Sequence, residues 1–275
     1  MHRIAFELGP VTVTWYGLLV TAGFLAGLLN ARRRAPRAGL SGDTVMDLGF
    51  WLMIGAMLGG RLYYVAANWS DYYAHQPMRE ILMIHHGGLV FHGGLIGAVL
   101  AGYLYVRRRG LPFWNLADVL APGIALGHAI GRVGCWINGC CYGIPTQMPW
   151  AIHYPPDYGV PGEGVHPVQL YEAFLDFALF VLLARWFGSR RQTGRIFAWY
   201  LALYGLVRFG IEFLRGDSPV RWLPAGLTAA QGVSLLLVAA GLILLAIRRT
   251  GGPPALPEEP RQAGAPEAHS RNAQP

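Results

Sequence analysis

The sequence contains no lysine and has few charged residues of any kind. Charged residues make up 13% of the 275 positions, whereas 53% are hydrophobic. An ordinary soluble domain has about 25% charged residues, so this composition argues against a soluble protein. All 22 basic residues are arginines, and they occur in short blocks between long apolar runs. The formal net charge of +7 is therefore not spread as on a nucleic-acid-binding surface. The pattern is typical of an integral membrane protein with its arginines on one side.

Seven apolar runs are long enough to cross a bilayer, since a membrane-spanning helix needs about 17–25 residues. They cover approximately 11–31, 44–67, 88–106, 114–137, 167–187, 196–214 and 228–247. The first is not a signal peptide, because its arginines follow the apolar run instead of preceding it. Arginine blocks follow the first, third, fifth and seventh runs. These blocks share one side only if there are seven spans, and that side is then cytoplasmic.

The runs predict an all-α integral membrane protein with seven transmembrane helices around an outward-opening polar cavity. Its N-terminus is expected outside and its C-terminus in the cytoplasm. We predict one transmembrane domain, residues 1–249, in which residues 138–166 form a periplasmic head loop. Residues 250–275 are mainly Pro, Gly, Ala and Glu, with almost no large apolar side chains. Such a composition predicts a disordered cytoplasmic tail.

The fourth and sixth predicted spans carry arginine together with other polar residues, although ionisable residues inside a membrane are costly and usually functional. In the sixth span, Tyr204, Arg208, Glu212 and Arg215 occur at i, i+4, i+8 and i+11, on one stripe of a helix. The fourth span carries Arg132 near its outer end. Arginine binds phosphate as a rigid fork, so these residues indicate an anionic phospholipid headgroup drawn into a cavity. Two simpler interpretations remain open. Arg208 and Glu212 could form a pair that only satisfies itself, and Arg132 could extend to the outer headgroups.

Glycines accompany these polar groups. Gly131 and Gly134 flank Arg132, and the unit HGGL occurs twice, before and within the third span. Glycine lets helices or a ligand approach closely. His92 lies beside paired glycines in the second unit, where a functional and a structural role both remain open. His86, in the first unit, is nearer the loop and is the weaker candidate.

Three further polar residues occur at the outer ends of predicted spans. Gln169 and Glu172 share one face at the start of the fifth span, in HPVQLYE, where Pro167 suits a first helical turn. We expect these two side chains to cap and anchor the helix. Tyr16, in WYG of the first span, is expected in the aromatic belt of the membrane interface.

Together, these segments resemble the bacterial prolipoprotein diacylglyceryl transferases. The resemblance covers about residues 12–247, with WYG at 15–17, HGGLIG at 92–97, GRVG and NG within 131–139, HPVQLYE at 166–172 and YGLVRFGIEFLR at 204–215. It implies a multi-pass enzyme of the bacterial inner membrane, with its active site toward the periplasm. Such an enzyme moves the diacylglyceryl group of phosphatidylglycerol to the lipobox cysteine thiol of a prolipoprotein and releases glycerol phosphate.

The resemblance also implies roles for individual residues. His92 would be the general base for the thiol, and Arg132 and Arg208 would stabilise the leaving phosphate. The substrate-binding residues would be Arg132, Tyr16, Tyr204, Arg208, Glu212, Asn138 and Gly139, with Glu212 holding Arg208 in place. No metal or organic cofactor is implied. The partners would be phosphatidylglycerol, prolipoprotein signal peptides and membrane lipid, and not nucleic acid.

The chain departs from the family in one stretch. The usual signature there reads approximately Gly-Arg-x-Gly-Asn-Phe-x-Asn-Gly-Glu. This sequence has Cys135 for the Asn, Trp136 for the Phe and Cys140 for the Glu. A non-catalytic lipid-binding or transport protein, or a transferase with another acceptor, is therefore an alternative to the family's reaction.

All three cysteines of the chain, Cys135, Cys140 and Cys141, lie in this stretch. They could bind a metal with His128, although structural zinc sites use ligands from separate elements and an adjacent Cys-Cys pair chelates poorly. They could carry the lipid as nucleophiles, but the related family transfers directly. In a third interpretation Gly139 turns the chain back, and a disulfide joins Cys135 to Cys140 or Cys141 on the oxidising side of the membrane. We expect the third, so that the cysteines shape the headgroup end of the cavity.

Overall fold

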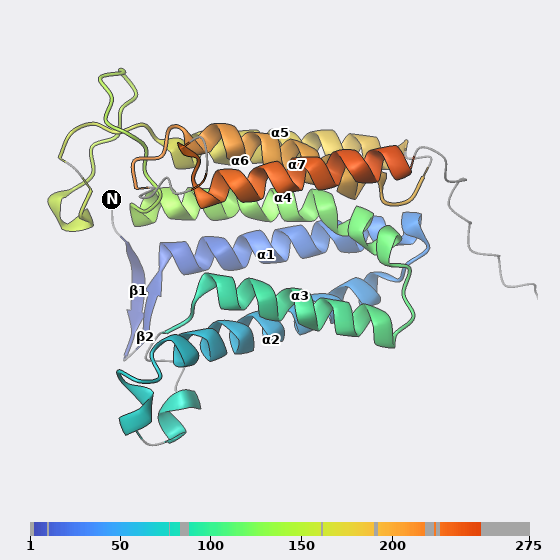
Figure 1. Cartoon of the computed structure of the whole chain (residues 1–275), viewed down its shortest axis with the longest axis horizontal. Helices are drawn as coiled ribbons and strands as arrows, with labels where there is room; N and C mark the ends of the chain where they lie inside the picture. The colour runs from blue at the N-terminus through green and yellow to red at the C-terminus, as the bar shows by residue number, and fades with distance from the viewer. Residues whose placement is uncertain are drawn as a thin grey trace, which may run out of the picture.

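The structure is a computed structural model that describes residues 3–9, 11–76, 78–82, 88–160, 162–189, 192–217, 223 and 226–248. Within these residues, seven α-helices run side by side along the long axis of the molecule (Figure 1). They are α1 (Trp15–Arg34), α2 (Gly42–Ala67), α3 (Phe91–Arg108), α4 (Phe113–Asn138), α5 (Val168–Gly188), α6 (Arg195–Glu212) and α7 (Ala229–Ile247). His86, Arg190, Arg191, Arg249 and the predicted tail lie outside the described residues.

The helices match the seven predicted runs, but a short β-hairpin precedes α1. Strands β1 (Ile4–Leu8) and β2 (Val11–Thr14) pair antiparallel, so the predicted all-α class missed this element. The sequence of β2, VTVT, is made of β-branched residues that favour strands. Thr14 then ends the strand and caps α1, because its hydroxyl accepts the N–H of Gly17 at 3.2 Å. The first helix therefore begins at Trp15 and not at residue 11.

Apolar surface and length indicate contact with a membrane. The described helices α2, α4 and α7 are long and apolar enough to cross one, judged by length and composition. Helix α7 also exposes large apolar side chains, with Leu236 71% and Ile243 58% exposed. Large contiguous apolar surface of this kind is costly in water, so the described part of the chain is suited to lipid.

Facing glycines bring two pairs of helices into backbone contact. Gly23 and Gly27 of α1 lie against Gly127 and Gly123 of α4, and a Cβ on Gly27 would come within 2.5 Å of the Gly123 carbonyl oxygen. Such spacing of small residues, four apart on each helix, is typical of helix contacts in membranes.

The α2–α3 pair repeats this arrangement. Gly55 and Gly59 of α2 face Gly97 and Gly93 of α3, and a Cβ on Gly55 would come within 2.5 Å of the Gly97 carbonyl oxygen. The paired glycines of HGGLIG are therefore explained by the contact between α3 and α2.

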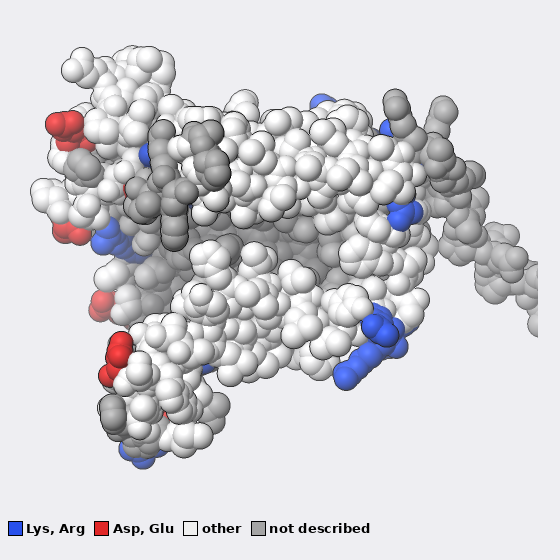
Figure 2. Space-filling model, in the orientation of Figure 1, with Lys and Arg blue, Asp and Glu red and all other residues white. Residues whose placement is uncertain are grey.

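The helices form two groups, with α1 between them (Figure 1). Helix α4 contacts α1, α5 and α6, and α6 contacts α7, whereas α3 packs mainly on α2. Figure 2 shows the surface hollowed between the α2–α3 pair and the helices on the other side of α1. An apolar cavity of about 420 Å³ lies there, lined by residues of α2, α3, α4 and α6 that include Leu52, Leu120 and Ile124. A second cavity of about 290 Å³ shares these three residues and extends along α4 to Gly127. We call the two together the apolar groove.

Candidate active site

A buried ion pair joins α4 to α5. Nη2 of Arg132 donates to the Glu172 carboxylate at 2.8 Å, and both residues are buried. The sequence had suggested that Glu172 anchors the helix at the membrane interface. The structure instead places its carboxylate in a buried ion pair. It lies in the second turn of α5, where it neutralises an arginine on the neighbouring helix.

A second buried pair lies on α6. Nη2 of Arg208 is 2.7 Å from Glu212, one turn further along the helix. The other oxygen of Glu212 accepts the hydroxyl of Thr228 at 2.9 Å. Thr228 caps α7 together with Gln231, each side chain bonding the other's backbone N–H. The start of α7 therefore holds Glu212, which in turn pairs with Arg208.

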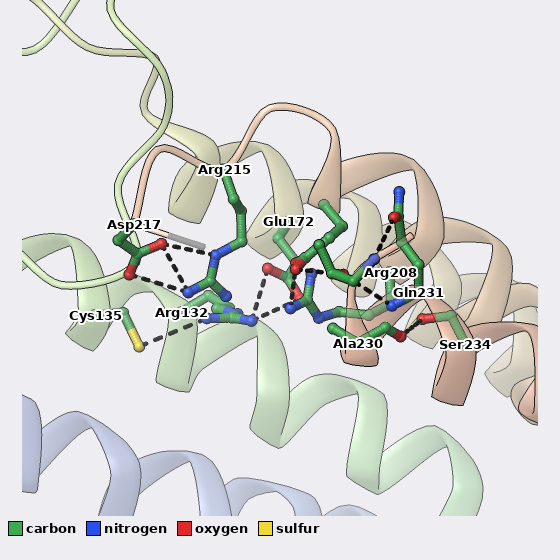
Figure 3. A network of polar contacts seen from close by, with 11 residues as sticks. Arg132, Cys135, Glu172, Arg208, Arg215, Asp217, Ala230, Gln231 and Ser234 are labelled. Atoms are coloured by element: carbon green, nitrogen blue, oxygen red, sulfur yellow. Dashed lines mark hydrogen bonds and ion pairs between the residues drawn. The ribbon is translucent and has the colours of Figure 1, made fainter. Parts of the chain in front are cut away.

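The two arginines lie at the same depth because Asp118 sets the register of α6 against α4. The buried Asp118 carboxylate accepts the N–H groups of Gly194 at 2.8 Å and Phe197 at 2.9 Å. Arg132 follows Asp118 by 14 positions, and Arg208 follows Gly194 by 14 positions (132 − 118 and 208 − 194). At about 1.5 Å per residue, both arginines are roughly 21 Å from this fixed end. Figure 3 shows them on either side of Glu172.

Each of these arginines keeps a donor that its carboxylate does not use. Within the part of the chain that the structure describes, the buried Nε of Arg132 and Nη1 of Arg208 make no hydrogen bond. Buried donors without an acceptor cost about 1–3 kcal/mol each, and most are satisfied in native proteins. Two such N–H groups at one depth are suited to an anionic oxygen ligand.

A histidine pair lies one turn deeper than the Arg132–Glu172 pair. Nδ1 of His128 is 2.6 Å from the carboxylate of Asp176, which is fully buried. The ring of His128 also meets Tyr204 edge to face, with centroids 5.4 Å apart. The ring of His128 thus contacts α5 and α6, which counts against the metal site with the cysteines that was the least favoured of the three interpretations. Tyr204 thus packs against His128 from α6, one helical turn before Arg208.

The glycines around Arg132 have different roles. A Cβ on Gly134 would meet Cδ2 of Tyr16 at 3.4 Å, so Gly134 permits close approach of α1. The Tyr16 side chain, 40% exposed, lies near the outer end of α4. Gly131 has no described neighbour within 4 Å of its Cβ position. The predicted close approach is thus confirmed at Gly134 only.

The cysteines lie in a tight turn that ends α4. Gly139 adopts a left-handed conformation with φ of 72°, and Tyr158 packs against the position where a Cβ would be. The N–H of Cys140 then donates to the Cys135 carbonyl at 3.3 Å. The backbone carbonyl of Asn138 accepts a hydrogen bond from Nε of Arg3 at 3.1 Å. This bond connects the segment before the N-terminal hairpin to the turn. Gly139 therefore reverses the chain, as predicted.

The three thiols are free in the structure, so the predicted disulfide is not formed. Their sulfur atoms nevertheless lie within 4.8 Å of one another. Hydrogen bonds from Cys135 and Cys140 lower the pKa of the Cys141 thiol, and the guanidinium groups of Arg215 and Arg132 act in the same direction. Arg215 is paired with Asp217 at 2.8 Å and lies beyond the end of α6, close to Arg132 in Figure 3.

His92 lies on a different helix from the arginines. It occupies the first turn of α3 and is exposed, whereas the residues of Figure 3 come from α4 to α7 and the segments that follow α6. Contact of Gly93 and Gly97 with α2 fixes this end of α3. His92 and the arginines thus belong to different helix groups.

Of the two acidic residues of this site, the sequence had suggested a helix anchor for Glu172 and no role for Asp176. Glu172 and Asp176 are four apart on α5, and their partners Arg132 and His128 are four apart on α4. This matched spacing in two neighbouring apolar runs was a usable signal, since residues four apart share a helix face.

Comparison with known proteins gives one family. The sequence matches the family described as prolipoprotein diacylglyceryl transferase over residues 3–247. A relative from Finegoldia magna, named phosphatidylglycerol–prolipoprotein diacylglyceryl transferase, is 40% identical over 245 residues, covering 89% of this chain and 94% of that protein. Proteins of the same name from a Nostoc species and from Bacillus cereus are each 40% identical, over 253 and 258 residues. They cover 88% and 92% of this chain, and 88% and 94% of their own lengths.

Proposed function

The chain belongs to the prolipoprotein diacylglyceryl transferase family, and we propose that it transfers the diacylglyceryl group of phosphatidylglycerol to a prolipoprotein cysteine. The observation that carries this proposal is the pair of spare, buried arginine donors at one depth. The Nε of Arg132 and Nη1 of Arg208 suit the phosphate oxygens of a lipid headgroup.

The apolar groove supports the same substrate. It is lined along α4 as far as Gly127, five residues before Arg132. Five residues of helix span roughly 7.5 Å, which is less than the length of a lipid headgroup with its glycerol. A phosphatidylglycerol whose phosphate meets Arg132 and Arg208 can therefore extend its acyl chains into the groove between the two helix groups.

The transfer reaction requires cations that stabilise the leaving group and a base that accepts the proton of the acceptor thiol. The sulfur of the acceptor cysteine forms a bond to the terminal glycerol carbon of the diacylglyceryl group, while the bond from that carbon to the phosphate oxygen breaks. The electron pair leaves on glycerol phosphate, whose growing charge Arg132 and Arg208 stabilise. A thiol with a pKa of about 8.5 is mostly protonated at neutral pH, so a base is needed, and His92 takes this proton. The acceptor peptide then lies between His92 and the arginines.

The transfer can be tested directly. Purified protein is incubated with labelled phosphatidylglycerol and a lipobox peptide, and the peptide is analysed for a thioether-linked diacylglyceryl group. The same peptide with serine in place of its cysteine is the matched control. A thioether product on the cysteine peptide alone supports the transferase. Lipid binding without any product would instead favour a non-catalytic lipid-binding or transport protein.

We also propose that all seven helices cross the bacterial inner membrane, with the N-terminus and the 138–166 head loop on the periplasmic side. The last turns of α1 and α3 contain three and two arginines, and Figure 2 shows the red acidic groups at the opposite end of the molecule, where some blue atoms lie as well. Arginine-rich loops stay in the cytoplasm. The active site then faces the periplasm, and residues 1–249 form the transferase domain, followed by the segment 250–275 on the cytoplasmic side.

Reporter fusions test this topology. Fusions at Arg34, Arg108, Arg190 and the tail should all report the cytoplasm, and a fusion in the head loop should report the periplasm. A periplasmic signal from the tail would mean an even number of spans and would contradict the proposal.

A further inference from the structure

The three thiols at the outer end of α4 have no part in the transfer outlined above, yet they form a compact cluster. The sulfur atoms of Cys135, Cys140 and Cys141 lie within 4.8 Å of one another. Thiolates bind zinc at about 2.3 Å, which sets the sulfur atoms of a tetrahedral site roughly 3.8 Å apart. Small side-chain rotations would therefore bring all three sulfurs onto one ion.

The backbone conformation at Cys141 explains how two adjacent cysteines can both face Cys135. Adjacent residues in an extended chain point to opposite sides, which is why an adjacent Cys-Cys pair is a poor chelator. Cys141 does not follow this rule, because its φ is +63°, in the left-handed region that non-glycine residues rarely adopt. This conformation, together with the turn at Gly139, directs both cysteines of the pair toward Cys135. Uncommon backbone conformations of this kind cluster at functional sites.

Surrounding groups hold the turn in this shape. Nε2 of Gln169 donates to the Cys140 carbonyl at 2.7 Å. On the other side, the carbonyl of Tyr142 accepts the N–H of Gly216 at 2.9 Å. The turn is thus fixed to α5 and to the segment after α6, so the ligand atoms are placed before any ion arrives. Preorganised ligands of this kind favour a site over a flexible loop.

Charge also favours an ion bound by thiolates. One Zn²⁺ with three thiolates carries a net charge of −1, and the three thiols release three protons to water when it forms. Nη1 of Arg132 is 4.0 Å from the Cys135 sulfur (Figure 3). An anionic complex beside this guanidinium avoids an isolated charge in a partly buried site.

We propose that Cys135, Cys140 and Cys141 bind one Zn²⁺ as thiolates and leave its fourth position open to an incoming thiol. Zinc sites with three protein ligands and one open position are the catalytic type, and a thiol that binds the ion is deprotonated outright and releases its proton to water. Cys135 follows Arg132 by three residues, so an acceptor thiolate on this ion lies within one helical turn of the headgroup arginine. This inference rests on the proposed function and names a second way of activating its acceptor. It departs from the family resemblance, which implied no metal.

The site can be tested by cobalt substitution on the whole protein. The chain is purified in detergent with a reductant and without a tag, and Co²⁺ is added while thiolate-to-cobalt absorption is recorded. One Co²⁺ per chain is expected, displaced by Zn²⁺. The chain has no other cysteine, so this absorption can come only from the cluster. The triple variant Cys135→Ser/Cys140→Ser/Cys141→Ser should lose it. Cys135→Ser alone should bind at least about 100-fold more weakly, since loss of even an outer partner costs about 10–100-fold.

The matched control addresses a rival set of ligands. His128, Glu172 and Asp176 also place ligand atoms within 4.8 Å of one another. The variant His128→Ala should keep the thiolate absorption unchanged. Binding that is lost in His128→Ala but kept in the triple cysteine variant would overturn the proposal. A disulfide between two of the three cysteines, in protein whose thiols were blocked at cell lysis, would also overturn it.

The open position is tested on the same cobalt protein. A lipobox peptide with its cysteine should shift the cobalt spectrum, whereas the serine peptide should not. An unchanged spectrum with the cysteine peptide would refute the open position. Because these measurements need no turnover, a protein that binds cobalt and peptide but forms no thioether would count against the proposed function alone.

Discussion

The α2–α3 pair and the helices α4 to α7 hold together by opposite means. Between α2 and α3, glycines such as Gly55 and Gly97 bring the two backbones into direct contact. Between α4, α5 and α6, buried carboxylates such as Glu172 and Asp118 meet an arginine and free backbone N–H groups. Lipid gives helices no hydrophobic reason to associate, so each contact needs one of these two solutions.

The difference indicates where the chemistry lies. Glycine contacts fix geometry cheaply, and the α2–α3 pair uses them to hold His92 at a defined place. Buried ion pairs are expensive to form and are seldom the most stable solution. Their concentration around Arg132 and Arg208 therefore indicates that the function requires charged groups there. Variants of the two regions are expected to differ accordingly.

The largest effect is expected for Arg132→Ala. The substitution removes a cation whose several N–H donors can bind the leaving phosphate. Loss of a single directed donor already costs about 10²–10³-fold in rate. We expect turnover to fall by at least about 10³-fold in the thioether assay. The double variant Arg132→Ala/Glu172→Gln removes the carboxylate charge that the single variant leaves unpaired. If the double variant recovers transfer, Arg132 serves only to neutralise Glu172.

His92→Ala tests the other helix group. Loss of a general base costs typically about 10²–10⁴-fold, so turnover should fall by at least about 10²-fold. Binding of labelled phosphatidylglycerol should change little, because the headgroup arginines lie on α4 and α6. A parallel loss of lipid binding would contradict the role of a base and would place His92 in the lipid site.

Arg208→Lys separates charge from shape. Lysine keeps the charge and can still pair with Glu212, but it loses the planar fork that leaves Nη1 free for a phosphate. A loss of about 10²-fold in turnover is expected, comparable to one directed donor. Near-normal transfer by this variant would reduce Arg208 to a member of a structural ion pair.

The smallest effect is expected for Gly97→Ala in the glycine contact. A methyl group there would collide with the Gly55 carbonyl oxygen, and overpacking costs about 1–3 kcal/mol. The helix-propensity gain of about 1 kcal/mol offsets only part of this. We expect a lower unfolding temperature in detergent and a modest loss of transfer through displacement of His92. Gly210→Ala is the matched control, because no described atom lies within 4 Å of its Cβ position; it should unfold at an equal or higher temperature.

Much of this architecture could be predicted, and the exceptions have physical causes. Each predicted apolar run overlaps one of the described helices to within a few residues at either end, because length and hydropathy are local properties. The hairpin before α1 was missed since Val11–Thr14 is apolar enough to extend the first run. At the site, the stripe of Tyr204, Arg208 and Glu212 followed from spacing along one helix. The interfacial role expected for Glu172 was wrong, because its partner lies on another helix.

The sequence by itself determined the helical segments, the positions of the arginines and the motifs on which the family resemblance rests. All of these depend on residues within a few turns of one another. Only the tertiary structure decided that Arg132 pairs with Glu172, 40 positions away, and that His128 turns to Asp176 instead of to the cysteines. It also decided that three thiols meet, through a left-handed turn at Cys141. These contacts depend on the register between helices, which Asp118 and the facing glycines set through close packing, and no local pattern encodes a register between distant segments.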